Sequence, residues 1–335
     1  MTDVDQSLTL PKNLYLEITN RCNLRCKGCI LYNGNWELDR DISFDELTMI
    51  TDQLPDLEQI MLHGVGEPLL NLALPQMIRH LKNRNVYTLF NSNGILLDAR
   101  WQYDLIDAGL DELRISLDAA TPKGYRKIRN NSEFNRIVRN LRSFLNLQSS
   151  MHVNHPRLSL WFLGTEDNIF ELPEFVHLAN DIGIGDIYLQ RLVYFQDSGG
   201  YGVAKSAKSL RNSDGAYLEL IQKSHELATR LGIRFEASGL CKPGESIQSE
   251  TGAESPWMKC YRPSTLMYVT ANGNVLPCCI APFSTIDFAS IVLGNVFETP
   301  LEQIWRGPKY KTFREKLQSS QPPKCCRGCG ILWSL

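Results

Sequence analysis

The sequence lacks three features that would assign the protein to a class at once. Its 35 lysines and arginines are balanced by 37 aspartates and glutamates, so it has no basic excess for binding a nucleic-acid backbone. It has no apolar run that approaches the roughly 20 residues needed to cross a bilayer. Its N-terminus, MTDVDQSLTL, has neither a basic nor an apolar export region. We therefore expect a cytoplasmic protein with no membrane partner, and we do not expect nucleic acid as a ligand.

The chain also has no cysteine between Cys29 and Cys241, although it has ten in all. Three of the ten lie near the start of the sequence and seven lie near its end. In a chain without an export signal, thiols are more often metal ligands or catalytic groups than disulfides. The clustering therefore favours metal ligands.

Between the two cysteine groups, short β-branched or aromatic runs alternate with amphipathic runs, which is the pattern of βα units around a parallel sheet. Strands are expected at residues 14–19, 59–63, 86–91, 112–117, 157–163 and 186–193. Helices are expected at residues 44–54, 74–83, 98–108, 133–147, 169–182 and 214–231. The fold class is therefore α/β, a partial (β/α)6 TIM-like barrel that is two units short of a closed one.

Two segments of small and polar residues interrupt this pattern. Residues 197–209 follow the sixth strand and are interpreted as a lid, and residues 242–257 have the composition of a linker. The expected domains are a barrel at 1–235, a linker at 236–257 and a small α+β iron–sulfur domain at 258–335.

The C-terminal domain is expected to open with a hairpin. Asn272-Gly273 is a strong turn signal between two apolar runs. The expected elements are strands at 266–270, 274–277 and near 290–297, and helices near 301–306 and 309–318.

The first cysteine group, Cys22-x3-Cys26-x2-Cys29, follows directly on the first strand. It is therefore expected in a loop at the carboxyl-terminal mouth of the barrel. Three thiolates can hold three irons of a [4Fe–4S] cube and leave the fourth iron open for another ligand. A zinc site would instead complete its shell with a fourth protein ligand from elsewhere in the chain. The spacing favours the cluster and leaves zinc as an alternative.

With this loop and the motifs that follow the next strands, the chain resembles the radical SAM enzymes. Gly64-Val65-Gly66-Glu67-Pro68 is similar to that family's Gly-Gly-Glu-Pro motif, and Ser92-Asn93-Gly94 to its Thr-Asn-Gly. Ser116-Leu117-Asp118 looks like its ribose motif. The resemblance implies that the open iron binds S-adenosylmethionine (SAM), which is then cleaved to methionine and a 5′-deoxyadenosyl radical.

The resemblance implies that SAM is held by six residues: Gly64, Gly66, Glu67, Asn93, Ser116 and Asp118. Each of these motifs also has a plain interpretation when taken alone. Glu67 would be a solvated loop acid, Asp118 an N-cap for residues 122–128, and Arg129 either part of the site or a surface residue. One position departs from the family. Many relatives have an aromatic residue, which packs on adenine, where this chain has Gly28. Tyr32 is an alternative residue for this contact.

The second cysteine group resembles the opening of the SPASM extension, and still more its shortened "twitch" version. Cys260 and Cys278 are spaced as C-x12-G-x4-C, and Cys326-x2-Cys329 follows. The resemblance implies that these four cysteines hold an auxiliary [4Fe–4S] cluster, with a four-cysteine zinc ribbon as the alternative. Because the sequence ends six residues after Cys329 and leaves over only Cys241, Cys279 and Cys325, we expect one auxiliary cluster.

The expected function is that of an oxidoreductase-like radical SAM enzyme, which receives electrons from a donor such as flavodoxin or ferredoxin. Since no leader-binding domain precedes the first strand, the first expectation is a net dehydrogenation of a small molecule, with the auxiliary cluster as electron acceptor. One alternative is a maturase that modifies a peptide by thioether formation, epimerisation or a similar step. Another is a non-catalytic iron–sulfur electron carrier or sensor. Substrate contacts are expected from the fifth and sixth strand ends, at Trp161, Gln190, Arg191 and Tyr194.

Overall fold

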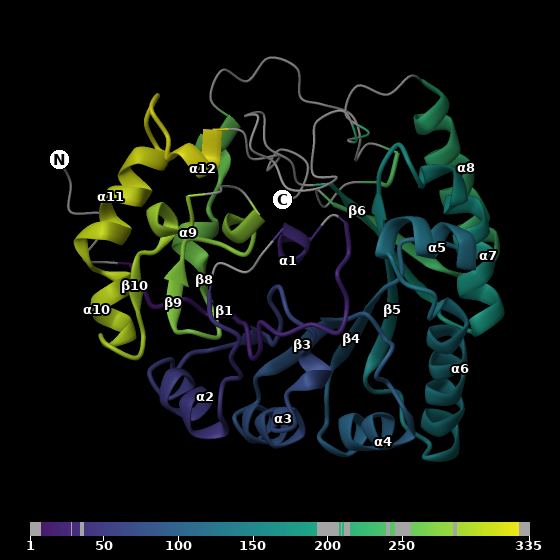
Figure 1. The fold of residues 1–335 in the computed structure, drawn as a ribbon, viewed down its shortest axis with the longest axis horizontal. Coiled ribbons are helices and arrows are strands. Elements are labelled where there is room, and N and C mark those ends of the chain that lie inside the picture. The colour runs from purple at the N-terminus through teal and green to yellow at the C-terminus, as the bar shows by residue number, and fades with distance from the viewer. Residues whose placement is uncertain are drawn as a thin grey trace.

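A computed structural model of the chain describes residues 8–27, 29–33, 37–192, 208, 210, 215–238, 242–244, 256–283 and 287–327. Its strands form a curved sheet that helices cover on the outside (Figure 1). The strands are β1 (Asn13–Leu16), β2 (Gln59–Met61), β3 (Tyr87–Ser92), β4 (Glu112–Ser116), β5 (Arg157–Gly164), β6 (Asp186–Arg191), β7 (Arg234–Ala237), β8 (Leu266–Val269), β9 (Asn274–Leu276) and β10 (Gly294–Asn295). The predicted partial barrel is confirmed.

Helices alternate with strands along most of the chain, as the sequence predicts. The longer ones are α2 (Phe44–Thr51), α3 (Leu74–Asn83), α4 (Ala99–Asp107), α5 (Pro122–Arg129), α6 (Phe134–Ser150), α7 (Leu172–Ile182), α8 (Gly215–Arg230) and α11 (Pro308–Leu317). The short ones are α1 (Ile30–Asn33), α9 (Arg262–Thr265), α10 (Leu301–Trp305) and α12 (Lys324–Arg327). Among the described residues, no helix is both long and apolar enough to span a membrane.

The strands form one sheet in the order β10-β9-β8-β1-β2-β3-β4-β5-β6-β7. All pairs from β1 to β7 are parallel, so their carboxyl ends meet at one edge. On its other side β1 pairs in parallel with β8, and Leu14 lies opposite Met267. The C-terminal hairpin therefore continues the sheet of the barrel.

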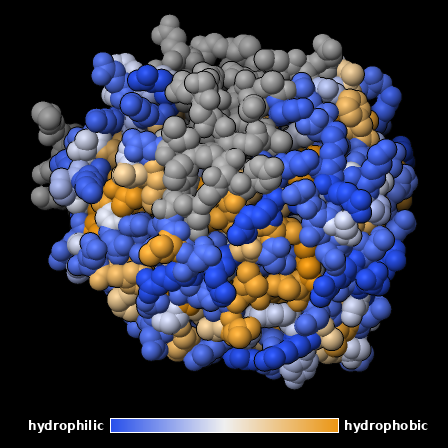
Figure 2. Space-filling model, viewed as in Figure 1, coloured by the Kyte–Doolittle hydropathy of each residue, from blue (hydrophilic) through white to orange (hydrophobic). Residues whose placement is uncertain are grey.

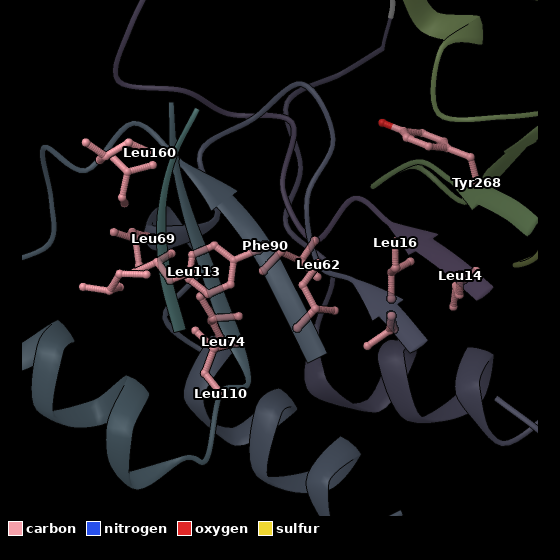
Figure 3. Close-up of a cluster of buried hydrophobic side chains, with 14 of the residues drawn as sticks. Leu14, Leu16, Leu62, Leu69, Leu74, Phe90, Leu110, Leu113, Leu160 and Tyr268 are labelled. Atoms are coloured by element: carbon pink, nitrogen blue, oxygen red, sulfur yellow. The ribbon is translucent and has the colours of Figure 1, made fainter. Parts of the chain in front are cut away.

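The core lies between the sheet and its helices (Figure 3). Leu14 and Leu16 of β1, Phe90 of β3 and Leu74 of α3 are fully buried there. Burying one such side chain stabilises the fold by about 1.5–3 kcal/mol. The buried side chains therefore hold the strands in place against the helices. Helix α2 begins at a capping box in which Ser43 and Glu46 each accept from the other's backbone N–H.

Two strands differ from the sequence prediction, and helices α1, α5, α9 and α12 are additional to the expected ones. Strand β7 is an addition: it pairs with β6 and ends at Ala237, past the expected domain boundary at 235. The strand expected near 290–297 is present but shorter: Gly294–Asn295 pairs with β9, whereas Phe288–Ile291 forms a 3-10 turn. The backbone N–H groups of Ser290 and Val292 bond to carbonyls three residues back, so this first part of the segment does not join the sheet.

Candidate active site

A cavity of about 810 Å³ opens at the carboxyl ends of the barrel strands. On the face seen in Figure 2, hydrophobic residues gather near the centre and hydrophilic residues surround them. All three cysteines of the first group line the cavity, and so do Gly64, Gly66, Glu67, Asn93, Ser116 and Asp118. The structure therefore brings the site residues predicted for the barrel to one place, as expected for the ends of parallel strands.

The cysteine loop is tied to the neighbouring strand ends by hydrogen bonds. The Glu67 backbone N–H donates to the carbonyl of Arg21 at 2.8 Å, and the Asn93 amide donates to the side chain of Asn23 at 2.8 Å. Burial raises the pKa of the Cys22 thiol to about 12 and that of Cys29 to about 11. These thiols keep their protons until a metal displaces them, because metal binding requires the thiolate.

The donor set of the first cysteine group consists of three thiols at the lining of one cavity. Among the described residues, no three histidine, cysteine or carboxylate side chains converge on a point where one ion would be held. The ligands of a cube bind different irons and stand farther apart than the four ligands of a tetrahedral zinc. Soft thiol donors at the mouth of a cavity therefore match the cluster that the motif predicts.

Glu67 is a buried acid and is not the solvated loop residue of the plain interpretation. It is 2 % exposed, and burial raises the pKa of its carboxyl. The carboxylate accepts from the Ser92 hydroxyl at 2.7 Å, the Asn93 backbone N–H at 2.8 Å and the Leu69 backbone N–H at 3.3 Å. Glu67 therefore fastens the second strand-end motif to the third.

Asp118 and Arg129 form a buried ion pair at the fourth strand end. Their oxygen and nitrogen atoms are 2.5 Å apart, and the other Asp118 oxygen accepts from the Leu163 backbone N–H at 2.8 Å. The N-cap interpretation of Asp118 is wrong, because Thr121 caps α5 and accepts from Gly124.

Arg129 is also not a surface residue. Its Nη1 lies 3.8 Å from the Cys26 Sγ, and its Nε has no hydrogen-bond partner in the part of the chain that the structure describes. A guanidinium with an unused N–H at the cysteine loop fits an anionic group, and the carboxylate of SAM is one.

Trp161 lines the cavity and is not a core residue. Its ring stacks on that of Tyr188 with centroids 4.1 Å apart, and the Arg114 guanidinium lies 4.7 Å above it. Gln190 and Arg191 also line the cavity, as predicted, while Tyr194 lies outside the described residues.

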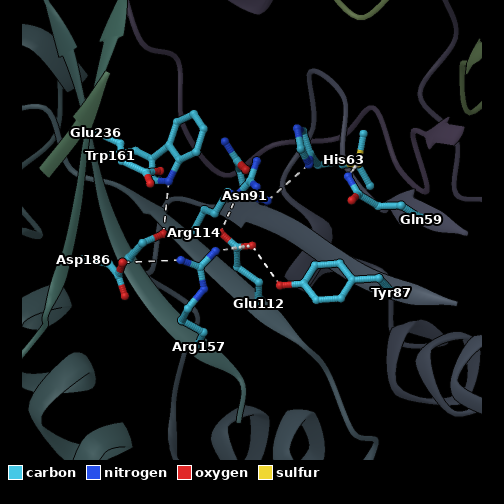
Figure 4. Close-up of polar contacts among 12 residues, drawn as sticks. Gln59, His63, Tyr87, Asn91, Glu112, Arg114, Arg157, Trp161, Asp186 and Glu236 are labelled. Atoms are coloured by element: carbon cyan, nitrogen blue, oxygen red, sulfur yellow. Dashed lines mark hydrogen bonds and ion pairs between the residues drawn. The ribbon is translucent and has the colours of Figure 1, made fainter. Parts of the chain in front are cut away.

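Below this stack, a network of charged residues spans the strands (Figure 4). Glu112 pairs with Arg114 and with Arg157, each at 2.8 Å, and Arg157 also lies 3.4 Å from Asp186. This network was not predicted from the sequence. Its signal is that Glu112, Arg114 and Ser116 alternate with Leu113 and Ile115 in one strand, which places both charges on one face.

His63 belongs to the same floor and is neutral. Its Nδ1 accepts from the Asn91 backbone N–H at 3.2 Å, so the remaining proton of the imidazole is on Nε2. Burial, reinforced by the charge of Arg114, lowers the pKa of His63 to about 3. The side chain therefore offers an N–H donor to the cavity and not a base.

The second cysteine group is split between two cavities. A small cavity is lined by Cys260, Cys278, Cys325 and Cys326. Cys279 instead lines the large cavity, where its Sγ is 3.0 Å from Nη1 of Arg262. Cys241 and Cys329 lie outside the described residues. Three of the four predicted auxiliary ligands therefore share one pocket, with Cys325 as a further thiol there.

Two family models match the chain in agreement with this geometry. The model of the radical SAM superfamily matches residues 16–175, and that of the SPASM iron–sulfur cluster-binding domain matches residues 260–330. The chain belongs to the radical SAM superfamily. Its cofactors are accordingly SAM, the cluster that binds it, and auxiliary iron–sulfur in the SPASM domain.

Several known proteins are similar in sequence to part or nearly all of this chain. A PqqA peptide cyclase of Gluconobacter oxydans is 26% identical in an alignment that covers 95% of this chain and 82% of that protein. The tungsten-containing aldehyde ferredoxin oxidoreductase cofactor-modifying protein of Pyrococcus furiosus is also 26% identical, but over 54% of this chain. That match covers 52% of the relative, so the chain spans about half of its length.

The solved structures of Streptococcus suis SuiB have the same fold. SuiB bound to S-adenosylmethionine has a TM-score of 0.70 and 19% identity, with 98% of this chain and 72% of that chain covered. SuiB bound to its precursor peptide SuiA has a TM-score of 0.64 and 17% identity, with 96% and 70% covered. The fold of this chain is thus similar to that of SuiB along nearly its whole length.

Proposed function

We propose that the protein abstracts a hydrogen atom from a peptide and that the resulting radical loses an electron, which the auxiliary cluster would accept, and a proton to solvent, so that the peptide is oxidised by two electrons. The observation that carries this proposal is the single cavity that is bordered by the cysteine loop, the strand-end motifs and the SPASM domain. Relatives that match along nearly the whole chain are peptide cyclases, which favours a peptide over the small molecule that the sequence analysis ranked first.

When bound, the cluster supplies the electron that cleaves SAM to methionine and a 5′-deoxyadenosyl radical. The chain's own residues bind, orient and exclude water. In this proposal the backbone edge at Gly64 and Gly66 faces the methionine end of SAM, and Arg129 faces its carboxylate. Glu67 and Asn93 hold that edge to the cysteine loop, and Ser116 with Asp118 borders the ribose.

The wall between the two cavities supports an oxidation. Cys278 lines the auxiliary pocket and its neighbour Cys279 lines the substrate cavity. Ile280 lines both cavities, so the two spaces lie next to each other. A substrate radical formed beside this wall would be close to an acceptor, which a reaction without net oxidation does not need.

A small-molecule substrate is the second candidate, and the floor of the cavity favours it. The volume of about 810 Å³ lies in the range typical of small-ligand pockets. The charged network below Trp161 lines the same cavity and offers charged partners to the polar groups of a small molecule. A peptide would enter with one side chain, whereas a small molecule would enter whole.

The experiment is an anaerobic assay with reductant, SAM and deuterated candidate peptides or small molecules. We expect 5′-deoxyadenosine that carries deuterium from a peptide, and a peptide product that has lost two hydrogen atoms. Deuterium from a small molecule alone would favour the second candidate. A product in which one deuterium is replaced by hydrogen, with no further hydrogen lost, would exclude net oxidation and support epimerisation.

A non-catalytic electron carrier would form no 5′-deoxyadenosine at all. Cys26→Ala is the control, because it removes a ligand of the radical cluster and leaves the auxiliary cysteines intact. If this variant still formed 5′-deoxyadenosine, the assignment of Cys26 would be wrong.

A further inference from the structure

The turn between β8 and β9, residues 270–274, docks on the segment that follows the cysteine loop. Glu37 accepts from the Thr270 hydroxyl at 2.9 Å and from the Asn274 amide at 2.6 Å. The Asn272 amide donates to the carbonyl of Leu38 at 2.9 Å. The SPASM hairpin is thus held against the mouth of the barrel by side chains on both partners.

A second carboxylate joins this hairpin to the loop at Gly64–Gly66. Glu17 follows directly on β1 and is 1 % exposed. It accepts from the Val65 backbone N–H at 2.6 Å, from the Tyr268 hydroxyl at 3.1 Å and from the Ala271 backbone N–H at 3.3 Å. One buried side chain therefore holds three groups, of which the first belongs to the barrel loop and the others to the SPASM hairpin.

The loop packs on this carboxylate without a gap. A Cβ added at Gly64 would lie 2.0 Å from a Glu17 oxygen and 2.4 Å from the Tyr268 hydroxyl. Both atoms belong to buried side chains, so no further side chain fits between the loop and the carboxylate. The position of Val65 and Gly66 is consequently set by Glu17, and the position of Glu17 is set in part by the hairpin.

We propose that Glu17 is a positioning residue that couples SAM binding at the Gly64–Gly66 edge to the docking of the SPASM hairpin. The proposal rests on the placement of SAM given above. A ligand that orders this edge stabilises the contact of Glu17 with Val65, and the same carboxylate then holds Tyr268 and Ala271 more firmly. Because coupling between two sites is reciprocal, a loosened hairpin also weakens SAM binding.

The test uses the reconstituted holoenzyme under anaerobic conditions, with the dissociation constant of SAM measured by equilibrium dialysis. Glu17→Gln keeps the size of the side chain, but its amide N–H then points at the backbone N–H of either Val65 or Ala271. We therefore expect SAM to bind about tenfold more weakly. Tyr268→Phe keeps the carboxylate and removes one hairpin contact, so we expect a loss of about twofold to threefold. Glu46→Gln is the matched control. The Glu46 carboxylate also accepts from a backbone N–H, but it lies in the cap of α2, so this change should leave the dissociation constant of SAM unchanged.

Hydrogen exchange, read out by mass spectrometry, separates coupling from a general loss of structure. In the unaltered enzyme, SAM should slow exchange in residues 268–276 as well as in residues 62–68. In Glu17→Gln, the effect of SAM on residues 268–276 should disappear. Equal protection of the hairpin by SAM in both proteins, or an unchanged dissociation constant, would overturn the proposal.

Two further readouts keep the test decisive. If Glu17→Gln does not assemble, Tyr268→Phe alone decides. If SAM no longer slows hydrogen exchange in residues 268–276 of Tyr268→Phe, the coupling is supported. If SAM slows it as much as in the unaltered enzyme, the coupling is overturned. Without SAM, exchange in residues 62–68 should be faster in Glu17→Gln than in the unaltered protein. This measurement does not depend on turnover, so a failure of the proposed reaction and a failure of the coupling give different results.

Discussion

Glu17 and His63 are expected to give the stability of the protein two opposing dependences on pH. Burial, together with the charge of Glu37, raises the pKa of Glu17 to about 7, against about 4.3 in an unfolded chain. Burial lowers the pKa of His63 to about 3, against about 6.5 unfolded. Between about pH 4.5 and 6.5, Glu17 is protonated in the folded state and ionised in the unfolded state. In the same range, His63 is neutral in the folded state and protonated in the unfolded state.

The signs follow from these protons. The Glu17 contribution is fully present below about pH 4.3 and is lost as the pH rises to about 7, because the folded state is then forced to ionise a buried acid. The His63 contribution is fully present above about pH 6.5 and is lost as the pH falls toward 3. Each slope is about 1.4 kcal/mol per pH unit within its window, so the two nearly cancel between about pH 4.5 and 6.5.

Substitution of either residue should therefore expose the slope of the other. The free energy of unfolding of Glu17→Gln, relative to the unaltered protein, should rise by about 3 kcal/mol between pH 5 and pH 8. His63→Asn, whose amide oxygen can replace Nδ1 as acceptor for the Asn91 N–H, should instead make stability fall with pH between about 4.5 and 7. The measurement is urea unfolding followed by circular dichroism on the SAM-free holoenzyme under argon.

The outcome also separates two roles of Glu17. At pH 8 the Gln variant should be the more stable protein and yet bind SAM more weakly, because the charge that costs folding energy is the one that holds Val65. A residue that acted only through stability would change both quantities in the same direction. If the difference in free energy of unfolding between Glu17→Gln and the unaltered protein stays the same from pH 5 to pH 8, the reasoning is refuted.

Three further predictions follow from the site. Arg129→Met leaves Asp118 buried without its partner and should cost about 3–5 kcal/mol in urea unfolding, while the double variant with Asp118→Asn should recover most of it. Cys278→Ser should reduce the iron content of the reconstituted protein, whereas Cys279→Ser should not, because only the first thiol lines the auxiliary pocket; equal losses would contradict this division. Iron analysis of the unaltered protein should give about eight irons per chain for two cubes, and about twelve would show a second auxiliary cluster.

Most of the barrel could be predicted from sequence because its signals are local. The helix at 74–83 has the bounds that its apolar spacing indicates, and each strand from β1 to β6 lies within a few residues of an apolar run. Strand β7, Arg-Phe-Glu-Ala, alternates charged with apolar residues over only four positions, too short a run to be distinguished from a loop. The motifs were found for the same reason, since each directly follows a strand.

Glu17 and the floor network could not be found in this way, because their meaning depends on contacts between distant parts of the chain. Glu17 is a single acid beside an apolar strand, and only its contacts with residues 65, 268 and 271 show why it is tolerated there. The same holds for Glu112, whose two arginine partners come from its own strand and from β5. A buried charge costs free energy unless it is paired, so an acid in an apolar strand is a signal that partners exist. The sequence cannot say which partners they are.

The register of the sheet bounds where a substrate can react. Tyr15 of β1 lies opposite Tyr268 of β8, and Tyr268 lies opposite Leu276 of β9. Cys279 follows β9 and lines the same cavity as the cysteine loop, while Glu112 and Arg157 line it among the barrel strands. We therefore expect the reacting carbon to lie in this cavity between the cysteine loop and Cys279.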